Sequence, residues 1–200
     1  MPKKFWNQSF SADEFVYGEA PNEFIRETSS LFPEQAKVAC FAEGEGRNAV
    51  YLATMGHDVT TYDVSTVGLQ KTEQLAAKNN VQVKTVAADL TRDRVDQEQY
   101  DGATMIYGHV PKVDQQFFIE QMIHSVKRGG IIIFEVYSED QLHYRTGGPG
   151  SIDMLYDPQD ILQWIKSHQC LHFYYGEAER YEGVRHTGLG HVIQVILRKK

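Results

Sequence analysis

From residue 36 onward, short apolar runs alternate along the chain with longer segments in which apolar residues recur every three or four positions. Short apolar runs are typical of buried strands, and the longer periodic segments are typical of amphipathic helices. The runs predict strands at 36–42, 58–64, 81–90, 100–108 and 128–137. The periodic segments predict helices at 46–56, 65–79, 113–126 and 157–167. Strands that alternate with helices in this way form right-handed βαβ units, so the pattern predicts a parallel sheet covered by helices.

The two ends of the chain depart from this alternation. Near the C-terminus two strand-like runs, 171–181 and 190–199, are separated only by residues 182–189. A connection this short predicts a hairpin, so we expect the sheet to finish with an antiparallel strand. The first 35 residues are rich in aromatic side chains, and they contain one predicted helix, which begins after Pro21 with Asn22 as its cap.

Composition narrows the class of protein. The 200 residues, with 42% apolar and 24% charged side chains, are ordinary for a soluble globular domain. A formal net charge of −7 argues against a general binder of nucleic acids or anionic membranes. No apolar run is long enough to span a bilayer, and two cysteines are too few for a disulfide framework. We therefore expect one cytoplasmic domain over 1–200, monomeric or homodimeric, with no nucleic-acid or membrane partner.

A glycine-containing loop joins the first predicted strand to the first predicted helix. Gly44 and Gly46 permit a tight turn and the close approach of a ligand, and the helix after them is expected to present unpaired N–H groups to it. Gly44-x-Gly46-x-x-Ala49 fits the dinucleotide-binding pattern, and Asp63 ends the second predicted strand. A nicotinamide dinucleotide and S-adenosylmethionine both need this arrangement, so the loop alone leaves both cofactors open.

The segments after the loop favour S-adenosylmethionine (SAM). The strand ends YDVS and AADL follow in order, and they offer Asp63 for a ribose and Asp89 for an adenine amino group. The chain has no second nucleotide-binding half for a nicotinamide. The stretches YGEAPNEFI, EGEGRNAVYLATMGHDVTTYDVSTVGL and YRTGGPG resemble the class I SAM-dependent methyltransferases, in the branch related to tellurite-resistance and thiopurine methyltransferases.

This resemblance implies a Rossmann-like, doubly wound α/β sheet of seven strands, mostly parallel, with the last strand antiparallel. It implies SAM as cofactor, S-adenosylhomocysteine as product, and an N-terminal arm, residues 1–35, that covers the cofactor site. The cofactor-binding residues expected from the motifs and the resemblance are Trp6, Tyr17, Glu43, Gly44, Gly46, Arg47, Asn48, Asp63, Val64, Ser65, Ala88, Asp89 and Leu90.

Several of these residues have a second interpretation. The family often has an aspartate at the position of Cys40 and a glycine at that of Ala42, so Glu43 either recognises the cationic part of the cofactor or is simply solvated. Arg47 either holds the methionine carboxylate or is a surface arginine, and Asp63 is either a ribose ligand or a helix cap. The aromatic residues of the arm either cover the cofactor or pack on the sheet.

Candidate acceptor-binding residues lie in the segment RYEGVRHTGLGH. The resembling tellurite-resistance proteins carry a His/Arg pair at the place of Arg185 and His186. Arginine offers a rigid fork of donors for an oxyanion, and histidine adds a donor or a proton. His109 follows the fourth predicted strand, at the edge of the sheet where ligands bind in open α/β folds. A solvated hairpin turn and a satisfied loop histidine are the alternatives.

Together these features predict methyl transfer to a small, soft or anionic acceptor, such as a chalcogen oxyanion or a thiol, with Arg185, His186 and His109 as catalytic residues. A SAM-binding regulator without turnover and a NAD-dependent oxidoreductase are the alternative functions. Residues 145–150 are interpreted either as a lid over the acceptor or as an ordinary connection. The histidines around Cys170 lack the partners of a metal site, so no metal is expected.

Overall fold

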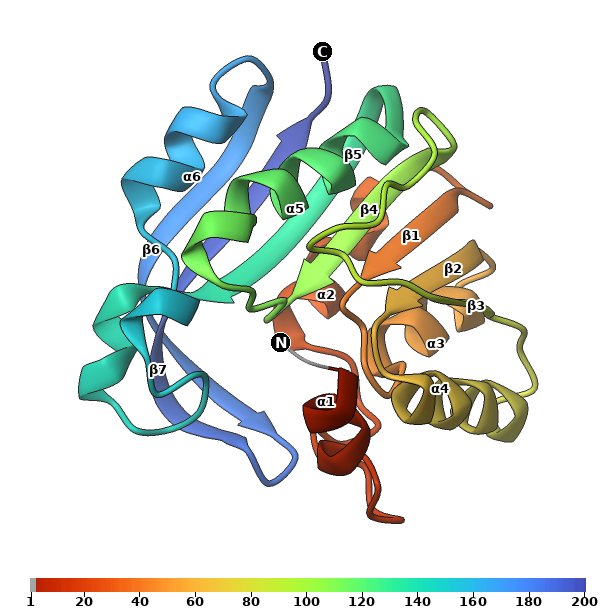
Figure 1. Cartoon of the computed structure of the whole chain (residues 1–200). Coiled ribbons are helices and arrows are strands. Elements are labelled where there is room, and N and C mark those ends of the chain that lie inside the picture. Colours follow the sequence, from red (N-terminus) through yellow and green to blue (C-terminus); the bar gives the residue numbers. More distant parts are fainter. Residues whose placement is uncertain (1–2) are drawn as a thin grey trace.

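A seven-stranded sheet forms the centre of the computed structural model, which describes residues 3–200 (Figure 1). Its strands, in spatial order β3-β2-β1-β4-β5-β7-β6, are β1 (Lys37–Phe41), β2 (Asp58–Asp63), β3 (Lys84–Ala87), β4 (Tyr100–Ile106), β5 (Val126–Tyr137), β6 (Gln169–Glu182) and β7 (His186–Arg198). The first five strands are parallel, and β7 runs antiparallel to both β5 and β6. This confirms the predicted Rossmann-like fold class.

Helices cover both faces of the sheet (Figure 1). One face carries α2 (Glu23–Thr28), α3 (Arg47–Thr54) and α4 (Thr66–Lys78), and the other carries α5 (Lys112–Ser125) and α6 (Pro158–Ile165). Short 3₁₀ turns occupy Ser29–Leu31, Glu139–His143 and Ile152–Met154. Two hydrophobic cores, one on each face, bury the alternating apolar side chains of β1, β4 and β5. Among residues 3–200, no helix has the length and apolar character needed to cross a membrane.

Local sequence explains most element boundaries. The side chain of Asn22 accepts a hydrogen bond from the N–H of Ile25 and begins α2, as predicted. The predicted strand 81–90 is too long, and only β3 is formed. The N–H of Val81 donates to the carbonyl of Ala76 and so extends the end of α4, while the carbonyl of Asp89 accepts from the N–H of Asp93 in a turn.

The N-terminal arm contains a helix that the sequence pattern does not predict. Helix α1 (Lys3–Ser9) is only seven residues long, which is too short to show an amphipathic period. It contacts α4 and lies near the carboxyl ends of the parallel strands (Figure 1). Met1 and Pro2, which belong to the predicted arm, lie outside the described residues.

The C-terminal hairpin is longer than predicted, and the expected connection at 182–189 is wrong. Strands β6 and β7 remain paired up to Glu182 and His186, so the turn contains only residues 183–185. Gly183 has φ +62°, a left-handed conformation that closes a short hairpin loop without steric cost. Because β5 pairs with β7 only from Val192 onward, the rest of the hairpin extends past β5 as a two-stranded ribbon that reaches the N-terminal arm.

Candidate active site

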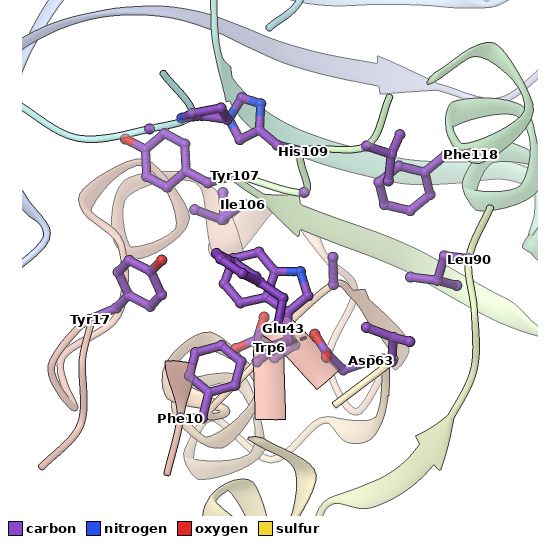
Figure 2. A pocket seen from close by; sticks show the side chains of 18 of the residues that line it. Trp6, Phe10, Tyr17, Glu43, Asp63, Leu90, Ile106, Tyr107, His109 and Phe118 are labelled. Atoms are coloured by element: carbon purple, nitrogen blue, oxygen red, sulfur yellow. Dashed lines mark hydrogen bonds between the residues drawn. The ribbon is translucent and has the colours of Figure 1, made fainter. Parts of the chain in front are cut away.

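A cavity of about 370 Å³ lies beyond the carboxyl ends of β1, β2 and β4 (Figure 2). In open α/β sheets ligands bind in this position, beside the point where the strand order reverses, which here lies between β1 and β4. The wall consists of residues of the glycine loop and of the N-terminal arm, residues that follow β2, β3 and β4, one residue of α5, and residues from the C-terminal part of the chain. These further lining residues include Val64, Ala88, Asp89, Leu90, Tyr107, His109, Phe118, Pro149, Arg185 and His186.

The carboxylate of Glu43 caps helix α3. Its Oε1 accepts hydrogen bonds from the N–H groups of Asn48 and Ala49, at 2.7 and 2.9 Å. The expectation that the helix presents unpaired N–H groups to a ligand is therefore wrong for these two donors, because the chain supplies its own anion. Glu43 is buried, which excludes the solvated alternative, and burial raises the pKa of its carboxyl group against the lowering effect of the hydrogen bonds.

Asp63 ties the glycine loop to the start of α4. Its Oδ2 accepts from the N–H of Gly44 at 2.9 Å, and its Oδ1 accepts from the N–H of Ser65 at 2.7 Å. The carboxyl group lines the cavity but is buried, and this burial raises its pKa to about 6 despite the backbone hydrogen bonds. Asp63 thus sits where the ribose interpretation requires it, at the end of β2, while also fixing the loop.

Two predicted cofactor residues, Gly46 and Ser65, are not part of the cavity wall. Gly46 faces α4, where an added Cβ would lie 2.5 Å from the hydroxyl of Thr72. Ser65 caps α4 through the N–H of Gly68 and donates to the side chain of Asn7. Both residues therefore hold the glycine loop and the start of α4 in place without lining the cavity. The other predicted cofactor residues line the cavity.

Aromatic side chains of the N-terminal arm point into the cavity (Figure 2). Trp6 stacks on Phe10 with ring centroids 5.3 Å apart, and Phe10 is buried against Gly44. An added Cβ on Gly44 would lie 3.0 Å from the Phe10 ring, so this close contact requires glycine. Tyr17 lines the cavity farther along the arm. The arm thus forms one wall of the cavity.

A buried ion pair anchors this arm. The ammonium group of Lys71 lies 2.6 Å from the carboxylate of Glu45 and donates to the carbonyls of Ala12 and Glu14. The second oxygen of Glu45 accepts from the N–H of Val16 at 2.8 Å. A buried pair of this kind is retained only when its remaining donors and acceptors are also satisfied, and here the backbone of the arm satisfies them.

The opposite end of the cavity is aromatic. Tyr107 stacks on Tyr137 with ring centroids 4.4 Å apart, and its hydroxyl donates to the buried carboxylate of Glu135 at 2.5 Å. Tyr107 has φ +55°, which is costly for a bulky residue and is maintained here by these contacts. Gly147 packs so closely against His186 that an added Cβ would lie 2.8 Å from the imidazole Cδ2.

His109 lines the cavity, but both of its ring nitrogens are engaged. The N–H of Tyr137 donates to Nε2 at 3.3 Å, which leaves Nδ1 to donate its proton to the carbonyl of Met154 at 2.7 Å. Burial lowers the pKa of His109 to about 4, so the imidazole is neutral near pH 7. The satisfied-histidine interpretation therefore describes this residue, and in this arrangement neither nitrogen is free to take a proton.

Two ion pairs lie buried beneath the cavity. Arg47 is paired with Glu182 at 2.6 Å, which excludes the surface-arginine interpretation, and Arg180 is paired with Glu135. The side-chain amide of Asn22 donates to both carboxylates, at 2.8 Å to Glu182 and 3.1 Å to Glu135. The network is therefore electrically balanced, with two cations and two anions.

Arg185 also lines the cavity, but it does not belong to this ion-pair network. Its guanidinium group lines the cavity and donates to the hydroxyl of Ser9 at 2.7 Å. Within residues 3–200 no carboxylate lies within 4.0 Å of it. The predicted neighbours Arg185 and His186 both reach the cavity, whereas His191, from the same segment, instead contacts the hydroxyl of Ser138.

Comparisons with known proteins bear on the domain and its fold. Residues 38–130 match the family model described as a methyltransferase domain. No curated protein matches the chain. A structure of a protein studied for the conversion of a disulfide bond into a thioacetal group during echinomycin biosynthesis has a TM-score of 0.77 and 13% identity, covering 98% of this chain and 89% of that one.

Two further structures share the fold. TehB from Haemophilus influenzae has a TM-score of 0.74 and 16% identity, over 99% of this chain and 67% of that one. A SAM-dependent methyltransferase from Anabaena variabilis has a TM-score of 0.71 and 14% identity, over 99% of this chain and 93% of that one. At these identities the shared property is the fold.

Proposed function

We propose that this chain is a SAM-dependent methyltransferase that methylates a small, soft or anionic acceptor. The methyltransferase domain matched at residues 38–130 and the fold support this proposal. The observation that carries this proposal is the cavity at the carboxyl ends of β1, β2 and β4, whose wall combines the acidic residues Glu43, Asp63 and Asp89 with Arg185 and His186. Its volume of about 370 Å³ suits a small-molecule site, for which roughly 300–1,000 Å³ is usual.

The acidic end fits the cofactor. Asp63 lines the cavity at the end of β2, where its carboxylate is placed to accept from the ribose hydroxyls. Asp89 lies after the next strand, β3. Partial burial raises the pKa of its carboxyl group, but the hydrogen bonds from Thr91 outweigh burial and lower this pKa. Asp89 is therefore ionised and able to accept from an adenine amino group. When bound, SAM supplies a methyl group that is already activated on a sulfonium.

The methionine end of the cofactor is assigned to Glu43 and Arg47. The Oε2 atom of Glu43 has only a long contact, 3.4 Å, with the amide of Asn48, so it keeps the capacity to accept from a cationic amino group. Arg47 is held at the cavity wall by Glu182, and it remains the candidate partner of the methionine carboxylate. The loop residues Gly44 and Asn48 complete this end.

We also propose that residues 1–35 act as an arm over the cofactor within a single domain. Trp6, Phe10 and Tyr17 contribute to the cavity wall, and the Lys71–Glu45 pair fixes the backbone between them. An arm in this position excludes water from the reacting groups, which is what transfer of a methyl group between aligned atoms requires.

The acceptor end is assigned to Arg185 and His186. A guanidinium group without a carboxylate partner attracts an anion or a strongly polarised atom, and the tyrosines beside it form an apolar surface. His109, whose nitrogens are both engaged, orients the wall through Tyr137. One structural neighbour is named for chemistry at sulfur, the conversion of a disulfide into a thioacetal, which favours a soft acceptor for this chain as well.

Ligand binding tests the cofactor assignment. S-adenosylhomocysteine is expected to raise the melting temperature because it binds only the folded state, whereas NAD is expected to have no effect. A shift with NAD alone would identify an oxidoreductase. A shift with S-adenosylhomocysteine, without product release from SAM on any acceptor, would identify a regulator.

Methyl-transfer assays over a panel of thiols and chalcogen oxyanions test the acceptor assignment. The double substitution Arg185→Ala and His186→Ala is expected to abolish transfer while SAM affinity, measured by calorimetry, stays near that of the wild type. Full activity in the double variant would refute the role of these two residues. An inactive wild type over the whole panel would refute the acceptor class.

A further inference from the structure

Glu182 and His186 face each other across the hairpin turn between β6 and β7. They are register partners, and the Oε2 atom of Glu182 lies 3.9 Å from the Nδ1 atom of His186. Both side chains are buried, and Nδ1 makes no hydrogen bond with any part of the chain that the structure describes. The carboxylate oxygen nearest to His186 therefore lies close to a buried ring nitrogen that has no hydrogen-bond partner among the described residues.

The carboxylate of Glu182 is held in its ionised form. Arg47 donates to Oε2 at 2.6 Å, and the amide of Asn22 donates to Oε1 at 2.8 Å. Burial alone would raise the pKa of Glu182, but His186 and Arg47 outweigh it and lower the pKa to about 2. An ionised carboxylate only accepts hydrogen bonds, so it favours a proton on the nitrogen that faces it.

Packing fixes the imidazole of His186 on its other sides. Its ring contacts Tyr17 with centroids 4.5 Å apart and meets Tyr107 edge to face at 4.6 Å. The Cδ2 atom, which adjoins Nε2 in the ring, lies against Gly147 at the cavity wall. With Nδ1 directed at Glu182, Nε2 is the nitrogen left for a ligand.

Burial keeps the imidazole of His186 neutral near pH 7. Burial lowers its pKa, the carboxylates raise it, and Arg47 lowers it. The titratable and charged groups that face it from the surrounding elements are Glu182, Arg47, Glu135, Tyr17, Tyr107, Tyr137, His109 and the adjacent Arg185.

We propose that Glu182 is the positioning residue of His186, holding the proton on Nδ1 so that Nε2 receives a proton from an acceptor that carries one, such as a thiol. This inference rests on the proposed function and deepens it. Nε2 takes the proton from the acceptor atom, the electron pair of that atom forms the bond to the methyl carbon, and the carbon–sulfur pair stays with sulfur. The imidazolium formed is stabilised by Glu182 and later releases its proton to water.

This assignment separates two kinds of acceptor. An oxyanion that is already ionised needs no base, and Arg185 alone would orient it. A thiol that is mostly protonated near pH 7 gains from a base, for which a factor of roughly 10²–10⁴ is usual. The presence of an oriented, neutral imidazole therefore favours the protonated acceptor.

The first experiment is nitrogen NMR of protein labelled in its histidine rings, which needs neither cofactor nor acceptor. The His186 signals are identified by their loss in His186→Asn. We expect the wild type to show the tautomer with the proton on Nδ1. We expect Glu182→Gln to lose this preference and to titrate at lower pH, because the carboxylate that stabilises the imidazolium is gone. Glu179→Gln, an exposed glutamate of the same strand, is the matched control.

A wild-type spectrum with the proton on Nε2 overturns the proposal, and so does an unchanged tautomer and titration in Glu182→Gln. The wild-type spectrum keeps the test decisive even where Glu182→Gln folds poorly. With a thiol acceptor, the acidic limb of the kcat profile is expected to move to lower pH in Glu182→Gln, with kcat falling about tenfold or more. A protein that binds no S-adenosylhomocysteine but shows the expected tautomer refutes the proposed function and leaves the Glu182–His186 pairing standing.

Discussion

The charge of Asp63 makes cofactor binding dependent on pH. Burial raises the pKa of this carboxyl group to about 6, while the backbone N–H groups of Gly44 and Ser65 stabilise its ionised form. The ionised form accepts hydrogen bonds from ribose hydroxyls with both oxygens, whereas the protonated form has one oxygen occupied by its own proton. We therefore expect S-adenosylhomocysteine to bind more tightly as the pH rises through about 6.

The size of this effect follows from the pKa. A carboxyl group with a pKa of about 6 is about 10% ionised at about pH 5 and about 90% ionised at about pH 7. When only the ionised form binds, affinity increases about tenfold across this interval, which corresponds to about 1.4 kcal/mol. Isothermal titration calorimetry of S-adenosylhomocysteine at a series of pH values measures it directly.

Stability of the ligand-free protein changes in the opposite direction. The folded pKa of Asp63, about 6, lies above the ordinary value of 3.8, so protonation is easier in the folded state. The stability from this group is present below the ordinary pKa and is lost as the pH rises through the folded pKa, by up to about 3 kcal/mol. Urea unfolding at about pH 4 and about pH 7, compared with Asp63→Asn, isolates this contribution.

Asp89 provides the matched control for the binding experiment. Its pKa lies below the ordinary value, so it stays ionised over the whole interval, and Asp89→Asn is expected to weaken binding without changing the pH dependence. Asp63→Asn is expected to weaken binding and to remove the pH dependence. A wild-type affinity that is constant between about pH 5 and about pH 7 would refute the ribose assignment, as would an Asp63→Asn variant that keeps the wild-type slope.

Two further substitutions test the buried polar groups. Glu135→Gln leaves the buried Arg180 without its carboxylate partner, so urea unfolding should show a loss of about 3–5 kcal/mol, and a change below about 1 kcal/mol would contradict the paired network. The hydroxyl of Thr61 is buried with no hydrogen-bond partner among residues 3–200, so Thr61→Val should raise the free energy of unfolding by about 1 kcal/mol, and a loss of stability would show that the hydroxyl has a partner.

Most of the fold was predictable because its signals are local. The apolar runs of β1, β2, β4 and β5 and the caps Asn22 and Ser65 each lie within a few residues of the element they define. The predicted hairpin turn is misplaced because residues 186–191 are, apart from Leu189, polar or glycine, although they pair with β6. Pairing between neighbouring strands, not hydrophobicity, decides where this strand begins.

The candidate site was predictable where chain order places residues at strand ends, and unpredictable where distant segments meet. Gly44, Asp63 and Asp89 follow successive strands, so the topology brings them to one edge of the sheet. Tyr107 and Tyr137 also follow this rule, since Tyr107 directly follows β4 and Tyr137 ends β5, and this signal would have identified them. The buried network has no local signal, because it joins α2, α3, β5 and β6.

Glu43 shows how one side chain changes the interpretation of a motif. A helix cap is normally sought at the residue just before the helix, and in α3 that residue is Gly46, which has no side chain to offer. Glu43 reaches the helix from farther back because Ala42 and Gly44 both adopt positive φ, at +51° and +64°, and turn the loop back on itself. The carboxylate then occupies N–H groups that the sequence pattern assigns to a ligand.

In the proposed function, the distribution of paired and unpaired charges decides which part of the cavity receives the cofactor and which part receives the acceptor. Glu182 neutralises Arg47, and Glu135 neutralises Arg180, so neither cation projects a full positive charge into the cavity. Glu43, Asp63 and Asp89 remain as carboxylates at one end, and a sulfonium with an amino group is attracted there. Arg185 remains as a cation without a carboxylate partner among residues 3–200, so we expect a nucleophile with negative charge, or one that gains it as its proton leaves, to bind beside it. On this proposal the Arg47–Glu182 pair fixes a guanidinium group at the wall for the methionine carboxylate, and Arg185 is left for the acceptor.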